Sequence, residues 1–309
     1  MTTEALVLPA RTPRRPLARL RDGNTGPVLA VVLGIVALWY AAAILMNWQV
    51  TADAFERAGE RRSTVQIAAA TLEQERPMLP APHQILVELK KTVIDTPMTS
   101  RRSLVFHAWV TLSSTLVGFA MGAFLGIVLA VAIVHVKTLE RSLMPWIISS
   151  QTIPILAIAP IIIVVLGSIG ITGLLPKAII SAYLCFFPVT ISMVKGLTSP
   201  DPMQRDLMRT YSASLAQTLW KLRLPASLPY LFAGLKIAIA ISLVGAIVGE
   251  LPTGAQAGLG ARLLAGSYYG QTIQIWAALF GAAFLASVLV ALVGIAESWV
   301  NRRMGARAP

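Results

Sequence analysis

The most regular feature of the sequence is a series of long apolar runs separated by short polar segments. A helix that spans the hydrocarbon layer needs about 20 mostly apolar residues, since each residue adds about 1.5 Å. Six runs meet this requirement, and they cover residues 28–47, 107–134, 144–167, 174–196, 228–250 and 272–296. The pattern therefore predicts an all-α membrane protein with six transmembrane helices.

Composition supports a lipid-embedded chain. Of the 309 residues, 56% are hydrophobic and 13% charged, so one water-soluble domain would need more interior than a chain of this size provides. The single cysteine, Cys185, lies inside an apolar run and cannot form an intrachain disulfide. It also leaves no thiolate or mixed Cys/His spacing for zinc. Composition thus excludes a disulfide scaffold, a zinc-finger-type metal site and a disordered chain.

The first run, 28–47, resembles a secretory signal because basic residues precede it and Ala41-Ala42-Ala43 resembles a cleavage site. Its length exceeds the roughly 7–15 apolar residues of a signal core. We expect an uncleaved anchor.

Lys and Arg gather in alternate polar segments, which sets the orientation of the chain. The short loops at 168–173 and 251–271 are poor in basic residues. They contain only Arg262, and Lys177 lies nearby at the edge of the fourth run. The fifteen basic residues of the other side are Arg11, Arg14, Arg15, Arg19, Arg21, Lys137, Arg141, Lys195, Arg205, Arg209, Lys221, Arg223, Arg302, Arg303 and Arg307. This bias predicts that both termini are cytoplasmic. It also explains the net charge of +12 without nucleic acid.

The same pattern predicts the organisation of the chain. In the long external segment, 51–76 is expected to be helical, Pro77, Pro80 and Pro82 form a break, and a second amphipathic run lies near 84–94. The role of 51–76 is left open. The expected parts are a basic tail at 1–27, a helix at 28–47, the external segment at 48–106, a helical core at 107–296 with an internal segment at 197–227, and a tail at 297–309.

Small residues recur every four positions in two of the runs. Gly118, Gly122 and Gly126 share one helix face, as do Gly245 and Gly249. Because glycine lets helix backbones approach closely, these runs are expected to pack together within the chain.

The third run contains Pro145, Pro154 and Pro160, which remove backbone hydrogen bonds and bend the helix. Gln151, Thr152 and Pro154 are therefore candidates for lining a translocation pathway, and Glu250, at the outer end of the fifth run, is a further candidate. The alternative is a packing kink that contacts no solute.

Catalytic chemistry has little support in this sequence. Ionisable groups in the runs are few, and Lys236, Glu250 and His107 form no chain that would relay protons. The metalloprotease, serine-hydrolase and phosphate-loop motifs are all missing. We expect no catalytic residue, no metal and no cofactor, and any nucleotide hydrolysis must occur on another polypeptide.

The internal segment 197–227 carries an amphipathic pattern. Asp201 can cap a helix that Pro202 begins, and Leu224-Pro225 ends the pattern. A helix resting on lipid headgroups is the alternative to a protein-binding helix. The apolar stripe of this segment consists of Leu207, Tyr211, Leu215, Leu219 and Leu222.

Residues 206–225, DLMRTYSASLAQTLWKLRLP, resemble the EAA loop of permease subunits of binding-protein-dependent ABC importers. In that loop E-A-A is followed by a glycine four positions on and by a distal L-P. Asp206 falls at the glutamate, Ser212 at the glycine and Leu224-Pro225 at the L-P. TIPILAIAPIIIVVLG (152–167), FFPVTISMVKGL (186–197), GLKIAIAISLVGAIVGEL (234–251) and GLGARLL (258–264) resemble the nitrate/sulfonate/taurine group of these permeases. The resemblance covers roughly residues 81–300.

The segment departs from the family pattern at two informative positions. Asp206 is shorter than glutamate, and Ser212 replaces a glycine whose conformational freedom would let the chain turn. Whether 204–222 is one continuous helix therefore stays open.

The resemblance implies a type I permease, with a five-helix core after the N-terminal helix, in the bacterial inner membrane. It further implies an ATP-driven importer with a second permease copy, cytoplasmic ABC ATPase subunits and an external solute-binding protein. The residues implied for ATPase docking are Asp206, Arg209, Tyr211, Ser212, Ala213, Ser214, Leu215, Leu224 and Pro225.

Two other classes of function stay open from the residues alone. A stand-alone secondary carrier or channel would need no ATPase, although no internal symmetry supports it. A membrane-bound enzyme would be unusually poor in acid and base groups. The solute is not readable, and nitrate, alkyl sulfonates, taurine and a pyrimidine-like vitamin precursor are all compatible with the resemblance.

Overall fold

The computed structural model describes residues 25–60, 62–252 and 257–304. The basic residues expected in the N-terminal tail, from Arg11 to Arg21, and Arg307 lie outside this part. Every regular element in the described residues is helical, which confirms the predicted all-α membrane fold. The chain forms two compact units, Met1–Gln84 and Ile85–Pro309, and each is described by itself.

The first unit contains α2 (Thr25–Arg57) and α3 (Thr64–Thr71). The run at 28–47 forms part of α2, but the helix continues ten residues beyond it. Gly59, with a φ of 72°, follows the end of α2, and Ser63 caps α3. The stretch 51–76 is therefore two helical pieces and not one helix.

The segment after α3 lies against α2 and is held there by buried polar groups. The side chain of Asn47 accepts a hydrogen bond from the Met78 backbone N–H at 2.7 Å and donates one to the Leu79 carbonyl at 2.9 Å. Trp39 Nε1 donates to the Pro80 carbonyl at 3.1 Å. The predicted proline break is confirmed, and it is a fixed turn on the surface of α2.

The second amphipathic run is also helical. It forms α4 (Pro82–Lys90) and the π-helical turn η1 (Lys91–Asp95), and the boundary between the two units falls inside α4.

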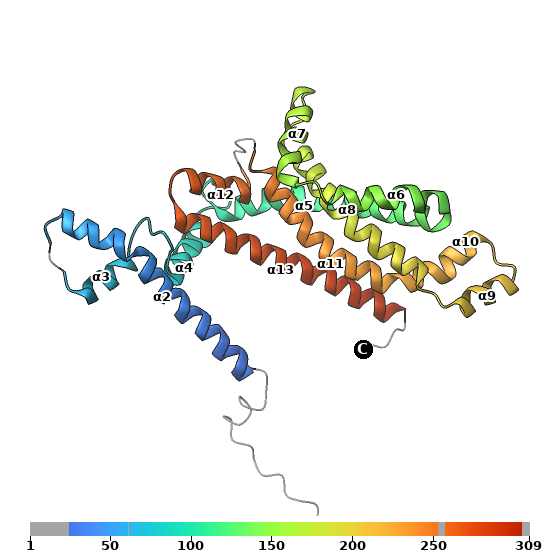
Figure 1. The fold of residues 1–309 in the computed structure, drawn as a ribbon, viewed down its shortest axis with the longest axis horizontal. Helices are drawn as coiled ribbons and strands as arrows, with labels where there is room; N and C mark the ends of the chain where they lie inside the picture. The colour runs from blue at the N-terminus through green and yellow to red at the C-terminus, as the bar shows by residue number, and fades with distance from the viewer. Residues whose placement is uncertain (1–24, 61, 253–256, 305–309) are drawn as a thin grey trace, which may run out of the picture. The chain divides into compact units, whose positions relative to one another are not determined.

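Four long helices of the second unit lie side by side (Figure 1), namely α5 (Leu104–His135), α8 (Leu174–Thr198), α11 (Leu224–Gly249) and α13 (Thr272–Arg303). Glycines bring three of them into close contact. A Cβ at Gly122 would lie 2.7 Å from the Ala182 carbonyl oxygen, and one at Gly245 would lie 2.8 Å from the Cα of Ser181. The predicted packing of these glycine faces is confirmed, with α8 between α5 and α11.

The third apolar run is not one straight helix. It is divided into α6 (Lys137–Ser150) and α7 (Ile155–Ser168), which meet at 97°. Pro154 is the N-terminal cap of α7, so the break falls where the proline removes a backbone donor. Within the described ranges, five helices are long and apolar enough to cross a membrane, and the bent pair gives up to six.

Short helices occupy the two ends of the bundle (Figure 1). At one end, α9 (Pro202–Thr210), α10 (Leu215–Thr218) and the π-helical turn η2 (Leu219–Arg223) connect α8 to α11. At the other end, α12 (Leu259–Tyr268) lies between α11 and α13 in sequence. The buried Leu259 packs there with Leu104, Ala278 and Ala282. The sequence predicted only a loop at 251–271.

Candidate functional site

The α9–η2 segment, residues 199–223, starts as its sequence predicts. Asp201 caps α9, because its carboxylate accepts a hydrogen bond from the Met203 backbone N–H at 2.8 Å. Pro202 is the first residue of the helix. Asp206 and Arg209 form an exposed ion pair with each other at 3.1 Å, so both side chains point into solvent on α9.

The stretch 204–222 is not one continuous helix, because the chain turns at Ser212. Its φ is 49°, the only positive value among the described residues other than glycine. This left-handed conformation costs roughly 1–2 kcal/mol for a residue with a Cβ. The chain turns here, and Ser214 begins α10 with a capping box in which Ser214 and Gln217 bond each other's backbone N–H. The segment is therefore two short helices joined by a turn at the position of the family glycine.

The predicted apolar stripe has an exposed part, which lies on both sides of this turn, and an attached part. Leu207, Tyr211 and Leu215 are 55%, 76% and 78% exposed. In contrast, Leu219 packs on a buried cluster of the bundle, together with Leu224 beyond the stripe, and Leu222 is half-buried. That cluster consists of Ala130, Met193 and Leu197.

The attachment makes the segment continuous with two long helices. α9 begins four residues after the end of α8, and η2 runs directly into α11, whose first two residues are Leu224 and Pro225. The segment thus connects the end of α8 to the start of α11. The remaining predicted docking residues, Ser212, Ala213 and Ser214, lie in the turn between α9 and α10.

Three of the four predicted pathway residues lie at the break between α6 and α7. Gln151 and Thr152 follow the last residue of α6, and Pro154 precedes the first residue of α7. The hydroxyl of Tyr183, on α8, donates to the Ser150 carbonyl and so ties this break to the bundle. Pro154 is exposed and Gln151 is half-buried.

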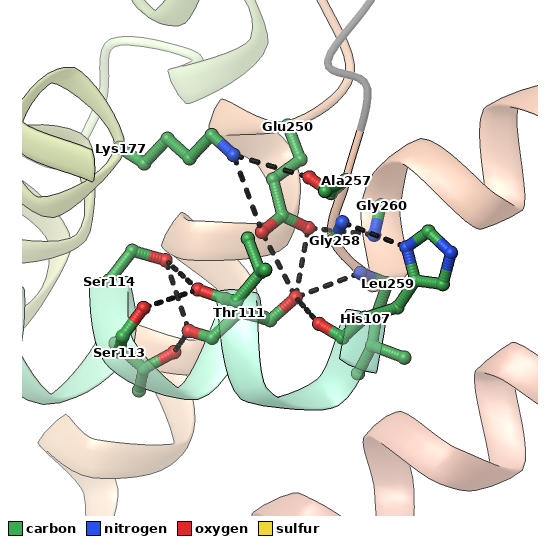
Figure 2. Close-up of polar contacts among 12 residues, drawn as sticks. His107, Thr111, Ser113, Ser114, Lys177, Glu250, Ala257, Gly258, Leu259 and Gly260 are labelled. Carbon is green, nitrogen blue, oxygen red and sulfur yellow. Dashed lines mark hydrogen bonds and ion pairs between the residues drawn. The ribbon is translucent and has the colours of Figure 1, made fainter. Parts of the chain in front are cut away.

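The fourth, Glu250, belongs to a different and fully buried cluster (Figure 2). Its carboxylate accepts a hydrogen bond from the Thr111 hydroxyl at 3.0 Å and one from the Gly260 backbone N–H at 2.8 Å. The ammonium of Lys177 lies 3.9 Å from Oε1. A carboxylate with no exposed surface requires such partners, because an uncompensated buried charge is strongly destabilising.

His107 takes part in the same cluster in a defined tautomer. Its Nε2 lies 2.8 Å from the Arg101 carbonyl, which can only accept, so Nε2 carries the proton. Nδ1 is then free to accept the Gly258 N–H at 3.0 Å. From the sequence alone His107 is only one of few ionisable groups in the apolar runs, since no local pattern links positions 107 and 258.

Arg262, on α12, adds a tie to the residues that precede α5. Its guanidinium donates to the Arg102 carbonyl at 3.4 Å. Burial lowers the pKa of Arg262, and the nearby Glu88 carboxylate opposes that shift.

The described residues thus form the fold of a multi-pass membrane protein, a helical bundle with a broken membrane-spanning element and a capped two-helix connection. The family described as "Binding-protein-dependent transport system inner membrane component" matches residues 122–306, which is more than half of the chain. The chain belongs to this family. It is a type I ABC importer permease and a multi-pass protein of the bacterial inner membrane, as the resemblance implied.

Individual relatives agree with this assignment. The chain is 34% identical over 186 residues to the formylaminopyrimidine transport permease protein ThiX of Halalkalibacterium halodurans, covering 59% of this chain and 68% of that protein. It is 32% identical over 196 residues to the riboflavin transport system permease protein RibX of Chloroflexus aurantiacus, covering 63% and 71%. It is 26% identical over 225 residues to the putative aliphatic sulfonates transport permease protein SsuC of Bacillus subtilis, covering 72% and 75%.

Proposed function

We propose that this chain is the transmembrane subunit of an ATP-driven importer and docks a cytoplasmic ABC ATPase through the α9–η2 segment. The observation that carries the proposal is that the large apolar side chains of Leu207, Tyr211 and Leu215 are exposed on a segment connected at both ends to long helices. Large apolar side chains exposed together on a rigid element are typical of protein-binding surfaces. ATP hydrolysis takes place on the separate subunit, and this chain performs no chemistry.

The geometry suits the transmission of force. Closure of the ATPase subunits displaces α9 and α10, and the continuous connections to α8 and α11 convert that displacement into movement of the glycine-packed bundle. In this arrangement the α9–η2 segment and both termini are cytoplasmic, and α12 is on the external side. A second copy of the chain completes the pathway, and an external solute-binding protein delivers the solute.

The break between α6 and α7 is the proposed pathway element. A broken helix leaves backbone polar groups without partners. Within the hydrocarbon layer such groups are tolerated only next to protein or a water-filled cavity. Gln151 and Pro154 at this break line the pathway. Glu250 is buried and does not face the pathway directly. We propose that it holds in place the residues at the external end of the pathway.

The relatives favour one class of solute among those that the resemblance allows. The relatives named for formylaminopyrimidine and riboflavin are 34% and 32% identical to this chain. The relatives named for sulfonate, nitrate and taurine transport are 26%, 27% and 29% identical. We propose a small solute of the pyrimidine-like class, with nitrate, sulfonates and taurine as the other candidates.

Purification of the chain from its native host tests ATPase docking. The tagged wild type is expected to recover a stoichiometric ABC ATPase, and Leu215→Asp is expected to lose it, because a charge would face an apolar groove. Ala216→Asp is the matched control, since it places the same charge on the same short helix one position off the stripe and should retain the ATPase. Failure of the wild type to recover an ATPase, together with gradient-driven uptake in ATPase-free vesicles, would instead establish a secondary carrier.

A further inference from the structure

The start of α12 has an unusual set of hydrogen-bond partners (Figure 2). The first backbone N–H groups of a helix lack partners within the helix, and the side chain of the capping residue normally accepts one of them. Here the capping residue is Gly258, which has no side chain, and the acceptors come from elsewhere in the fold. Each of three successive N–H groups, those of residues 258, 259 and 260, is bonded to a side chain of another element.

Two helices supply these acceptors. From α5, His107 Nδ1 accepts the Gly258 N–H at 3.0 Å, and the Thr111 hydroxyl accepts the Leu259 N–H at 2.8 Å. From the end of α11, Glu250 accepts the Gly260 N–H at 2.8 Å. The Glu250 carboxyl group also lies at the N-terminal end of α12, where the helix dipole favours negative charge.

The two glycines make this approach possible. Gly258 has a φ of 125°, a conformation that residues with a side chain rarely adopt. A Cβ at Gly260 would lie 2.9 Å from the Cβ of Glu250. The start of α12 therefore lies directly against the Glu250 side chain. A side chain at position 258 or 260 would displace Glu250.

Lys177 extends the same cluster to α8 through longer contacts. Its ammonium lies 3.9 Å from Glu250 Oε1 and donates to the Ala257 carbonyl at 3.3 Å. Lys177 is in the first turn of α8, so the carboxylate is a common contact point of α5, α8, α11 and α12.

We propose that Glu250 is a positioning residue that, with His107 and Thr111, fixes α12 to the α5–α8–α11 bundle, so that the external end moves together with the bundle. The consequence for transport rests on the proposed function. When nucleotide binding moves α9 and α10 at one end, the bundle carries that movement to α12 at the other. Without the three-point contact, the apolar packing of Leu259 and the Arg262 bond remain, and we infer that these contacts alone do not carry the movement of the bundle to α12.

Hydrogen exchange on the purified permease tests the contact itself, independently of any partner. Thr111→Val removes the hydroxyl at nearly constant volume. The Leu259 N–H then loses its acceptor, and the Glu250 carboxylate loses the hydroxyl that positions it. Exchange of the amides at 258–260 is therefore expected to accelerate roughly tenfold or more. Thr111→Ser restores the hydroxyl and should restore protection. The matched control is Thr190→Val, a buried threonine of α8 whose hydroxyl donates to the Phe186 carbonyl. Unchanged exchange in Thr111→Val would overturn the proposal.

A cysteine reporter on α12 tests the consequence in the assembled complex. Tyr268→Cys is suitable because Tyr268 is 79% exposed, whereas the native Cys185 is buried. Its reactivity with a thiol reagent is expected to change on addition of ATP and vanadate. With Thr111→Val added, this response should disappear while ATP hydrolysis continues, and Thr111→Ser should restore it.

The two proposals fail in different ways. Two results of the cysteine experiment overturn the coupling role of the cluster. One is a change in thiol reactivity that persists when Thr111→Val is added. The other is no change in thiol reactivity in the complex that carries only Tyr268→Cys. A complex that contains no ATPase overturns the proposed function, whereas the exchange result on the permease alone is unaffected by it.

Discussion

At the scale of single residues, Ser212 shows how one position decides the form of a segment. The family pattern has a glycine there, and the serine of this chain adopts a φ of 49° in the same turn. Hydrogen bonds on both sides hold the turn, since the Ser212 N–H donates to the Arg209 carbonyl at 2.8 Å and the Ala213 N–H donates to the Met208 carbonyl at 3.0 Å. The serine is thus accommodated by neighbouring hydrogen bonds.

Substitutions at Ser212 should separate backbone strain from side-chain contact. Ser212→Gly relieves the strain and is expected to retain the ATPase in co-purification. Ser212→Val places a β-branched side chain in a left-handed conformation, costs roughly 1–2 kcal/mol locally and should reduce ATPase recovery. Equal recovery with both variants would show that the turn does not determine docking.

At the scale of helices, the close approach of α5, α8 and α11 depends on glycine faces, which can be recognised in the sequence from their four-residue spacing. Four-residue spacing within one run is a local signal, and it correctly predicted which faces pack. The bend between α6 and α7 also has a local cause in Pro154, although its angle of 97° does not follow from the proline alone. The angle depends on contacts such as the one between Tyr183 and Ser150, which join residues far apart in sequence.

The glycine faces predict a contrast between two glycines of similar sequence context. Gly122→Leu would push α5 away from the Ala182 backbone, and overpacking of this kind costs about 1–3 kcal/mol. Gly34→Leu is the matched control, since a Cβ at Gly34 meets nothing within 4 Å within the described part of the chain. Thermal unfolding in detergent should show a lower midpoint for Gly122→Leu only. Equal midpoints would contradict the packing role of this face.

Across the whole molecule, local patterns predicted the membrane-spanning helices and long-range contacts determined the rest. The apolar runs located α2, α5, α8, α11 and α13, but α2 extends to Arg57 and α13 extends to Arg303, into the stretch 297–309 that was expected to be a tail. The sequence did not predict α12 or its cluster, because the bonds between Thr111 and Glu250 and between His107 and Gly258 join residues more than 130 positions apart. Glu250 was identified as unusual, but its burial depends on those distant partners.

We propose that the α9–η2 segment contacts an ATP-hydrolysing subunit on one side of the membrane, while α12 lies on the other side. Two exposed tyrosines test it as a matched pair, Tyr211 at one end of the bundle and Tyr268 at the other, with exposed fractions of 76% and 79%. A photocrosslinking amino acid is placed at each position in turn, and crosslinks are formed in intact cells. We predict that position 211 captures an ABC ATPase and that position 268 does not. Capture of the ATPase from position 268, or no capture from position 211, would contradict the account.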